Sequence, residues 1–298
     1  MTRTPRSDPP APATEPAAEP SAAPKRRGRP PRAGVAVPAS GADGPEEVRS
    51  TLFVNSVAKA MRVLTVFDST RRRLTLSQIA TLIEMDISAT QRFTYTLTKL
   101  GYLYKDDATK TYELSPRTVD IAYHYLSSNE LVHRATPFMH QLGVQTEEAT
   151  NLTVLDGTDV MIVSRIVSRH VLNPSVIAGA RIPAFCAAPG LAMLSRMPEE
   201  QVEALLKSSD LVAHTPFTVT GPAAIRERLV GIRARGYALT AEEWMLGDIS
   251  IAAPIVDAAG APIGAINIAV SKPRWQGLAD ERRFGDLVVA AAAAISGR

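Results

Sequence analysis

A group of polar side chains recurs with the spacing of one helical face near residue 90. At about 100° per residue, Gln91 and Tyr95 form the centre of this face, and hydroxyl and ammonium groups flank them. Such side chains can hydrogen-bond to base edges in a DNA major groove, with Arg92 at the margin facing a phosphate. The candidate DNA-contacting residues here are Ser88, Thr90, Gln91, Arg92, Tyr95, Thr98 and Lys99. This helix alone does not establish DNA binding, because every amphipathic surface helix has a polar face.

Spacings typical of catalysis are sparse. The histidines, at 124, 133, 140, 170 and 214, show no His-x-Glu or His-Glu-x-x-His pattern, and there is no Gly-x-Ser-x-Gly and no phosphate loop. Glu130, His133 and His140 share a helical face, but such a set lies more often on a solvated surface than in a metal site. We expect no metal, no cofactor and no enzymatic activity, with an enzyme as the less favoured alternative.

Cys186 is the single cysteine, so no intrachain disulfide can form, and the sequence fits a reducing, cytoplasmic compartment. Its neighbours Phe185, Ala187 and Ala188 are apolar, which raises a thiol pKa and lowers its reactivity. A redox sensor that uses Cys186 remains an alternative.

The polar helix belongs to a predicted helix-turn-helix. Ser56 is expected to cap a first helix, and Thr75 and Gln78 form a capping box for a second one. A second box, at residues 88–91, is expected to open the polar helix, with Phe93, Leu97 and Leu100 packed inward. Gly101 ends it, and residues 102–105 and 111–114 predict a hairpin that carries Lys105 and Lys110 as a wing beside the phosphates.

The following residues predict a mixed α/β (α+β) fold. Residues 151–155 and 160–166 flank the hairpin signal Asp156-Gly157, and residues 249–256 and 263–270 flank a second turn. Helices are expected at 198–207 and 222–235, where Gly236 follows as a stop. Two further helical patterns, at 116–128 and 130–142, connect the winged part to an antiparallel-sheet domain.

Composition divides the 298 residues unevenly. Residues 1–50 hold 11 of the 22 prolines and no Ile, Leu, Phe, Tyr or Trp, so we expect this Pro/Ala-rich tail to be disordered. Residues 1–50 carry a charge of +2, residues 51–115 carry +3 and residues 116–298 carry −2, which places the surplus where a polyanion would bind. The longest unbroken apolar run, 287–295, is too short to span a membrane.

Several segments together resemble the IclR-type bacterial transcription regulators. The similar segments are VNSVAKA at 54–60, LSQIA at 76–80, SATQR at 88–92, LGYL at 100–103, EATNL at 148–152, CAAPGLAML at 186–194 and IAAPI at 251–255. The resemblance covers about residues 52 to 296 in the expected order. It implies a winged helix-turn-helix at 51–115, a linker helix at 116–130 and a GAF-like effector-binding domain at 131–298. It also implies double-stranded DNA with a near-palindromic operator as one partner, a homodimer or tetramer, and no membrane.

The resemblance further implies a pocket for a small organic acid effector. The matching positions are Ala187, Ala188, Pro189, Gly190, Thr240, Glu242, Ser250 and Asn267. Members that bind small oxoacids often carry an acidic residue where Thr240 stands and a hydroxyl where Ala269 stands. These two departures favour a more apolar acid, such as an aromatic one. An orphan regulator with a filled pocket remains open.

A basic run in the tail, KRRGRPPR at 25–32, resembles an AT-hook. Arg27 and Arg29 could enter an A·T-rich minor groove, while the prolines hold the chain extended. A basic solubilising tail is the alternative.

Overall fold

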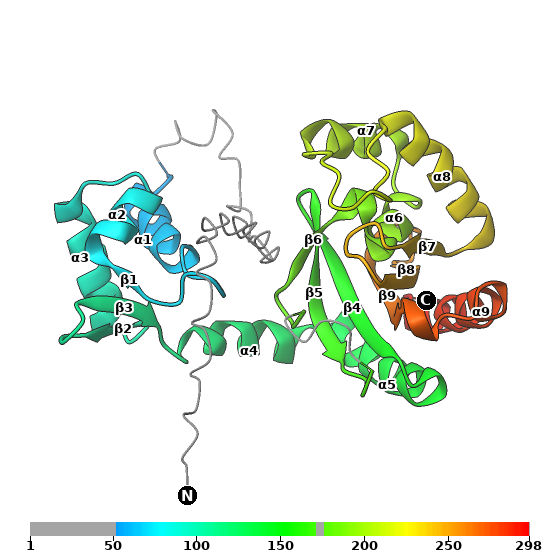
Figure 1. The fold of residues 1–298 in the computed structure, drawn as a ribbon, viewed down its shortest axis with the longest axis horizontal. Coiled ribbons are helices and arrows are strands. Elements are labelled where there is room, and N and C mark those ends of the chain that lie inside the picture. The colour runs from blue at the N-terminus through cyan, green and yellow to red at the C-terminus, as the bar shows by residue number, and fades with distance from the viewer. Residues whose placement is uncertain (1–51, 171–175, 298) are drawn as a thin grey trace, which may run out of the picture. The chain divides into compact units, whose positions relative to one another are not determined.

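The computed structural model describes residues 52–170 and 176–297 (Figure 1). The AT-hook-like residues Arg27 and Arg29 lie outside this part of the chain. The described residues form a helical N-terminal part with a small wing and a C-terminal part built on one antiparallel sheet. The predicted mixed α/β (α+β) fold class is therefore confirmed.

The winged domain contains three helices, α1 (Asn55–Thr65), α2 (Leu76–Leu82) and α3 (Ile87–Lys99). A three-stranded sheet in the order β1-β3-β2 completes it, from β1 (Leu74–Thr75), β2 (Leu103–Asp106) and β3 (Thr111–Leu114). Its core gathers apolar side chains from every element: Val63, Leu74, Ile79, Ile83, Leu97, Leu103 and Tyr112. The predicted helix-turn-helix and wing are both present.

The caps of these helices agree only in part with the sequence predictions. Thr75 and Gln78 form the expected capping box on α2. However, α1 begins at Asn55 without a side-chain cap, so Ser56 lies inside the helix. The cap of α3 is Asp86, whose carboxylate accepts a hydrogen bond from the Ala89 amide at 2.8 Å. Because α3 begins at residue 87, Ser88 falls in its first turn and is not the cap.

The buried face of α3 is also shifted from the predicted one. Thr90, Thr94 and Leu97 are buried, whereas Leu100 is 52% exposed. Leu100 is the residue at which the helix ends, at the margin of the buried face, so its side chain does not reach the core. The prediction that Leu100 packs inward is wrong.

Two helices follow the wing, α4 (Thr118–Ser128) and α5 (Glu130–Thr146). No residue of α4 is buried, and Val119, Ile121 and Tyr123 are exposed. By contrast, α5 begins at the cap Asn129 and buries Leu131, Met139 and other apolar residues in the C-terminal core. The two helical patterns therefore differ in their packing.

The C-terminal sheet has six antiparallel strands in the order β6-β5-β4-β9-β8-β7. Its strands are β4 (Ala149–Asp156), β5 (Asp159–Ile166), β6 (Arg181–Pro183), β7 (Ala238–Ala241), β8 (Asp248–Val256) and β9 (Pro262–Ser271). The two predicted hairpins are β4–β5 and β8–β9, and Gly157 takes the positive φ that the first turn requires.

Helices cover both faces of this sheet (Figure 1), and each face has its own core. On one face, large side chains such as Ile251, Ile266 and Ile268 pack against α5 and α9 (Leu278–Ile295). On the other face, the small Ala252 and Ala265 meet α6 (Ala188–Leu194), which packs in turn against α7 (Glu199–Ser208) and α8 (Pro222–Arg235). The predicted proline start and Gly236 stop of α8 are confirmed.

No helix of the described ranges has the length and apolarity that crossing a bilayer requires.

Gly190 lets α6 approach the preceding segment closely. A Cβ at this position would lie 2.2 Å from the carbonyl oxygen of Ala184, which is a backbone atom and cannot swing aside. We predict that Gly190→Ala destabilises the protein by about 1 to 3 kcal/mol, because the α6 packing must shift to relieve the clash. Urea unfolding measures the change.

The matched control is Gly231→Ala in the exposed part of α8, where an added Cβ would have no neighbour within 4 Å. This control should gain about 0.5 to 1 kcal/mol from the loss of a helical glycine. Equal unfolding midpoints for the two variants would contradict the packing role of Gly190.

Candidate functional sites

The polar face of α3 lines a groove that the wing closes on its other side. Gln91, Tyr95 and Lys99 are exposed on α3, and Tyr95 has 63% of its surface exposed. The complete lining is Ser88, Gln91, Arg92, Tyr95, Thr96, Thr98, Lys99, Lys105, Asp107 and Tyr112. The structure thus brings together seven of the eight DNA-contacting candidates that it describes.

Thr90 is the exception. Its side chain is buried, and its hydroxyl donates a hydrogen bond to the Asp86 carbonyl oxygen at 2.9 Å. Because α3 turns this residue toward the core, the prediction that Thr90 contacts DNA is wrong.

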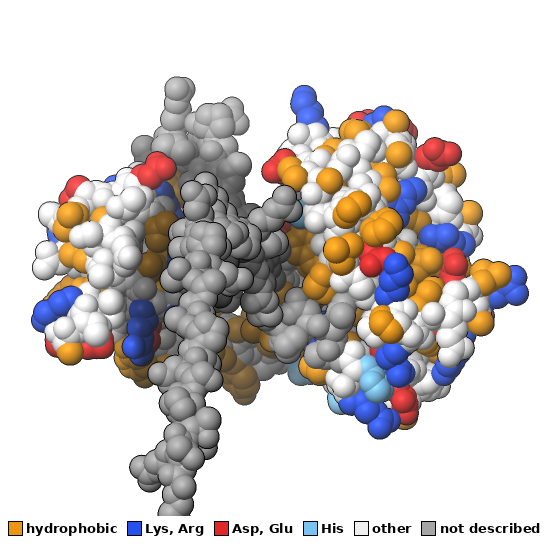
Figure 2. All heavy atoms as spheres, in the orientation of Figure 1, with side chains coloured by type: hydrophobic (Ala, Val, Ile, Leu, Met, Phe, Trp, Pro, Cys, Tyr) orange, Lys and Arg blue, Asp and Glu red, His pale blue; other side chains and the backbone are white. Residues whose placement is uncertain are grey.

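The charges of the groove are partly compensated. The Lys99 ammonium lies 5.5 Å from the centre of the Tyr95 ring, as a cation–π contact requires. On the wing, the Lys105 ammonium lies 2.8 Å from the Asp107 carboxylate, whose hydrogen bond raises the pKa of Lys105. Figure 2 shows basic and acidic side chains side by side over this hairpin. Asp107 therefore limits the attraction of the wing for a polyanion.

A second site is a cavity between the sheet and the start of α6. It is partly open to solvent. Apolar side chains from three segments form its walls: Ile162, Ile182, Cys186, Ala187, Ala188, Pro189, Trp244 and Met245. Its floor is the face of the sheet that α6 covers.

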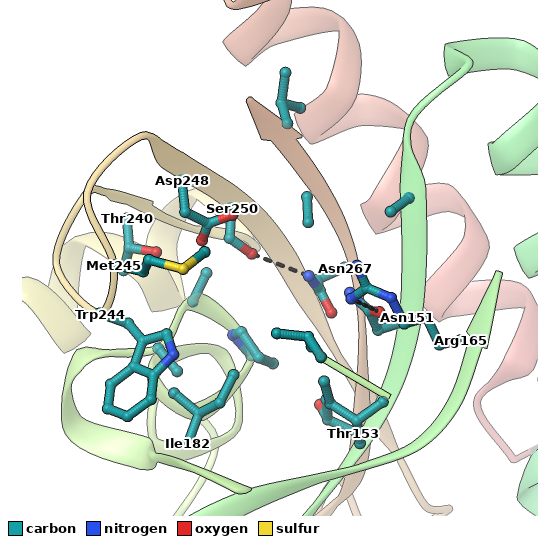
Figure 3. Close-up of a pocket in the computed structure, with 18 of the residues that line it drawn as sticks. Asn151, Thr153, Arg165, Ile182, Thr240, Trp244, Met245, Asp248, Ser250 and Asn267 are labelled. Carbon is teal, nitrogen blue, oxygen red and sulfur yellow. Dashed lines mark hydrogen bonds between the residues drawn. The ribbon is translucent and has the colours of Figure 1, made fainter. Parts of the chain in front are cut away.

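Polar residues cross that floor from strand to strand. Arg165 on β5 pairs in register with Asn151 on β4, and Asn151 pairs with Asn267 on β9. On the far side, Ser250 on β8 pairs with Thr240 on β7 and lies diagonally across from Asn267. All five line the cavity, and we call them the polar row. Figure 3 shows Asn267 between Ser250 and the Asn151–Arg165 pair.

Two hydrogen bonds join neighbouring side chains within the polar row. The Asn267 amide donates to the Ser250 hydroxyl at 3.0 Å, and a guanidinium nitrogen of Arg165 donates to Asn151 Oδ1 at 2.8 Å. Two buried atoms, Arg165 Nε and Asn267 Oδ1, have no hydrogen-bond partner among the described residues. Buried polar atoms are normally paired, so these two are exceptions within the polar row.

Two ionisable groups at the cavity have strongly shifted pKa values. Burial raises the pKa of the Asp248 carboxyl to about 6, although the positive charge of Arg165 opposes the shift. Burial also raises the pKa of the Cys186 thiol to about 12, so the thiol is protonated at neutral pH. The apolar environment expected for Cys186 is confirmed, since the whole residue is buried and lines the cavity.

The loop between β7 and β8 holds Trp244 and Met245 in the cavity wall. Glu243 beside them is buried and accepts two hydrogen bonds from Arg228, at 2.8 and 2.7 Å. Glu242 takes a positive φ of 60°, and its carboxylate accepts from the Gly247 amide at 2.9 Å and pairs with Lys272. These contacts fix the conformation of the β7–β8 loop.

Six of the eight predicted pocket residues line the cavity: Ala187, Ala188, Pro189, Thr240, Ser250 and Asn267. The predictions that Glu242 and Gly190 belong to the lining are wrong. Glu242 instead turns back to fasten its own loop, and Gly190 packs against Ala184.

Sequence reasoning missed Arg165 and Asp248. The register of β4 with β5 shifts between Leu152 and Thr153, which pair with Ser164 and Ile162. This bulge brings Arg165 to the same face as Ile162, although strict alternation would place residues three apart on opposite faces. Asp248 could have been found as the residue two before Ser250 on the same strand.

Comparison with protein families gives two matches. Residues 56–107 match the IclR helix-turn-helix domain. Residues 123–297 match the family described as bacterial transcriptional regulator IclR, C-terminal.

Three individual proteins illustrate the similarity. The Pca regulon regulatory protein of Pseudomonas putida is 31% identical over 240 residues, which is 80% of this chain and 82% of that protein. The p-hydroxybenzoate hydroxylase transcriptional activator of Acinetobacter baylyi is 32% identical over 227 residues, 74% of this chain and 83% of that one. A solved transcriptional regulator from Rhodococcus sp. RHA1 is 30% identical with a TM-score of 0.71, covering 82% of this chain and 97% of that one.

The raised pKa of Asp248 predicts a pH-dependent stability effect. Its value of about 6 exceeds the ordinary 3.8, so the folded state binds this proton more tightly than the unfolded chain does. The ionised carboxylate therefore destabilises the fold above about pH 6, and the effect fades as the pH falls toward about 4. Asp248→Asn should raise the Tm at about pH 7.5, and the gap to wild type should narrow by about pH 4.5.

Thermal unfolding at both pH values measures this gap, with the exposed Asp120→Asn as control. A gap that stays constant with pH, or one that Asp120→Asn reproduces, would contradict the desolvation of the Asp248 carboxyl.

Proposed function

The chain belongs to the IclR family of bacterial transcriptional regulators, and from this premise we propose that a small organic acid in the C-terminal cavity modulates its binding to an operator. The observation that carries the proposal is the polar row, which places a guanidinium, two side-chain amides and two hydroxyls along a cavity whose remaining lining is mostly apolar. A cavity of this kind suits a small ligand with one apolar body and a few polar groups.

For DNA, we propose that Gln91 and Tyr95 read base edges from α3, with Ser88 and Thr98 beside them. Arg92, Lys99 and Lys105 would hold phosphates on either side of the groove. We further propose that two copies bind a near-palindromic site, because the two-fold symmetry of a dimer matches two half-sites. The boundaries that go with this proposal are 51–115 for the reader, 116–130 for the linker and 131–298 for the sensor.

For the ligand, we propose an acid with an aromatic or similarly apolar body. Trp244, Met245 and Ile182 offer an apolar wall, and the Arg165 guanidinium offers a partner for a carboxylate. One relative that is 32% identical is named as the activator of p-hydroxybenzoate hydroxylase, an enzyme named for an aromatic acid. This name supports the same class of effector here.

We also propose that the protein acts in the cytoplasm and does not convert its ligand. The Cys186 thiol, with a pKa near 12, is a poor nucleophile at neutral pH, and the pKa shift also disfavours a redox role. The relatives described above are transcriptional regulators.

Substitutions in the groove separate base reading from phosphate binding. We predict that Gln91→Ala costs about 1 to 3 kcal/mol on the operator and relaxes specificity at one position. Lys99→Ala should instead weaken operator and random DNA alike and lower the salt slope by about one. Fluorescence anisotropy with both DNAs at several salt concentrations measures these effects. The groove assignment would be wrong if both variants had the same profile.

Filling the cavity tests the sensor role. We predict that an acid which raises the Tm of the protein also changes operator affinity by roughly 5- to 150-fold, the usual range of coupling between two sites. Ala269→Leu should abolish this response and leave ligand-free operator binding intact, because leucine would occupy cavity space without altering charge. The matched control is Val230→Leu, at an exposed position on α8.

A screen of organic acids with operator titrations provides the measurement. If every acid that stabilises the protein leaves operator affinity unchanged, the proposed sensor function fails.

A further inference from the structure

The C-terminal cavity contains one guanidinium and one carboxyl group that do not contact each other. Arg165 on β5 and Asp248 on β8 both line it, and Figure 3 shows them on opposite sides of Asn267. The Arg165 guanidinium donates to Asn151 Oδ1, and its influence on Asp248 is that of a charge at a distance. When both groups are ionised, their charges cancel within the cavity.

The ionised form of Asp248 is weakly stabilised. The residue is half-buried at the start of β8, and within the described ranges no group donates a hydrogen bond to its carboxylate. The positive charge of Arg165 favours ionisation, but desolvation outweighs this attraction. A carboxylate in this position responds strongly to any further negative charge that enters the cavity.

The other ionisable groups around Asp248 are paired or uncharged, with one exception. The two glutamates of the preceding loop form ion pairs, Glu242 with Lys272 and Glu243 with Arg228. On β9, the residue in register with Asp248 is the uncharged Ser271, and the Cys186 thiol across the cavity is protonated at neutral pH. The exception is His170, which also lines the cavity, and histidines can gain a proton between about pH 5 and 8.

We infer that a small aromatic acid enters this cavity together with a proton, which Asp248 takes up from solvent. This inference rests on the proposed function and adds a proton-linked control to the same site. A bound carboxylate near Arg165 cancels the attraction that keeps Asp248 ionised, and one near Asp248 repels it directly. Both placements favour the neutral Asp248 carboxyl, so the result does not depend on how the acid lies.

The charges of the complex lead to the same result. A guanidinium, an acid anion and a neutral Asp248 carboxyl leave the cavity without net charge from these three groups. An ionised Asp248 would instead leave one negative charge uncompensated in a largely apolar enclosure, which is costly.

Acid binding should therefore weaken as the pH rises. In the free protein the pKa of Asp248 is about 6, so above this pH most molecules must gain the proton when the acid binds. Well below this pH the proton is already present, and the affinity no longer depends on its uptake.

Benzoate is a suitable probe, because it is a singly charged aromatic acid. Isothermal titration of the full-length protein at pH 7.0, in phosphate and in MOPS, measures proton uptake, since the ionisation enthalpies of the two buffers differ. We expect about half to one proton per benzoate at pH 7.0, and an affinity roughly 4- to 8-fold weaker than at pH 5.5. This measurement uses the wild-type chain.

Variants identify the group that takes the proton. Asp248→Asn should abolish the uptake and most of the pH dependence, because asparagine stays uncharged. His170→Gln removes the other titrating group of the lining and should leave the uptake in place. The matched control Asp120→Asn makes the same change at an exposed position on α4 and should behave as wild type.

Three outcomes would overturn the inference. Equal binding enthalpies in the two buffers, with an affinity that does not change with pH, would show that no proton is taken up, and the proposed sensor function would still stand. Uptake that persists in Asp248→Asn and disappears in His170→Gln would assign the proton to the histidine. If benzoate does not bind even at pH 5.5, the neutral carboxyl does not admit a small aromatic acid, and the sensor function fails as well only if the broader acid screen finds no effector.

Discussion

The buried polar row across the C-terminal sheet is the constraint on which the rest of the domain depends. A guanidinium, two side-chain amides and two hydroxyls lie on a face that α6 covers, and polar groups are costly to bury unless they are paired. The opposite face is mostly apolar, since its isoleucines pack directly against α5 and α9, and its buried Thr150 hydroxyl donates to the Met139 carbonyl oxygen on α5. The domain thus has one face that is a filled core and one that keeps a cavity above polar atoms.

Small side chains and a glycine determine how α6 packs beside the cavity. Ala252 and Ala265 lie in the core that α6 covers, and Gly190 lets the helix approach the Ala184 backbone closely. The β7–β8 loop closes the remaining side through the Arg228–Glu243 pair, which positions Trp244. Residues that do not line the cavity therefore help to shape it.

Local signals made much of this architecture predictable. The Thr75–Gln78 capping box, the Asp156-Gly157 turn and the Gly236 stop each require particular residue types at fixed spacing, and the structure has all three. The start of α3 was harder to predict, because Asp86 and Ser88 are both residue types that cap helices. In the structure, Asp86 is the cap. The predicted positions of Thr90 and Leu100 were wrong for a related reason. A small rotation of the helix about its axis moves residues at the edge of the buried face into the core or out of it.

The candidate site was predictable where the sheet alternates regularly and not where it is irregular. Ser250 and Asn267 follow the alternation of their strands, whereas Arg165 reaches the cavity only through the bulge in the β4–β5 pairing. Glu242 has the positive φ that usually marks a glycine, so its side chain turns away from the cavity it adjoins in sequence. Long-range pairing sets both features, and no short motif encodes them.

The central claim is that the cavity and the groove proposed to read DNA are energetically coupled, and linkage makes this testable from the ligand side. The chain has two tryptophans, so a Trp275→Phe variant reports on Trp244 in the cavity wall alone. An acid that shifts operator affinity can be titrated against this fluorescence with and without saturating operator DNA. The account predicts that the DNA changes the Kd for the acid by the same factor by which the acid changes operator affinity. An identical Kd in both titrations would contradict it.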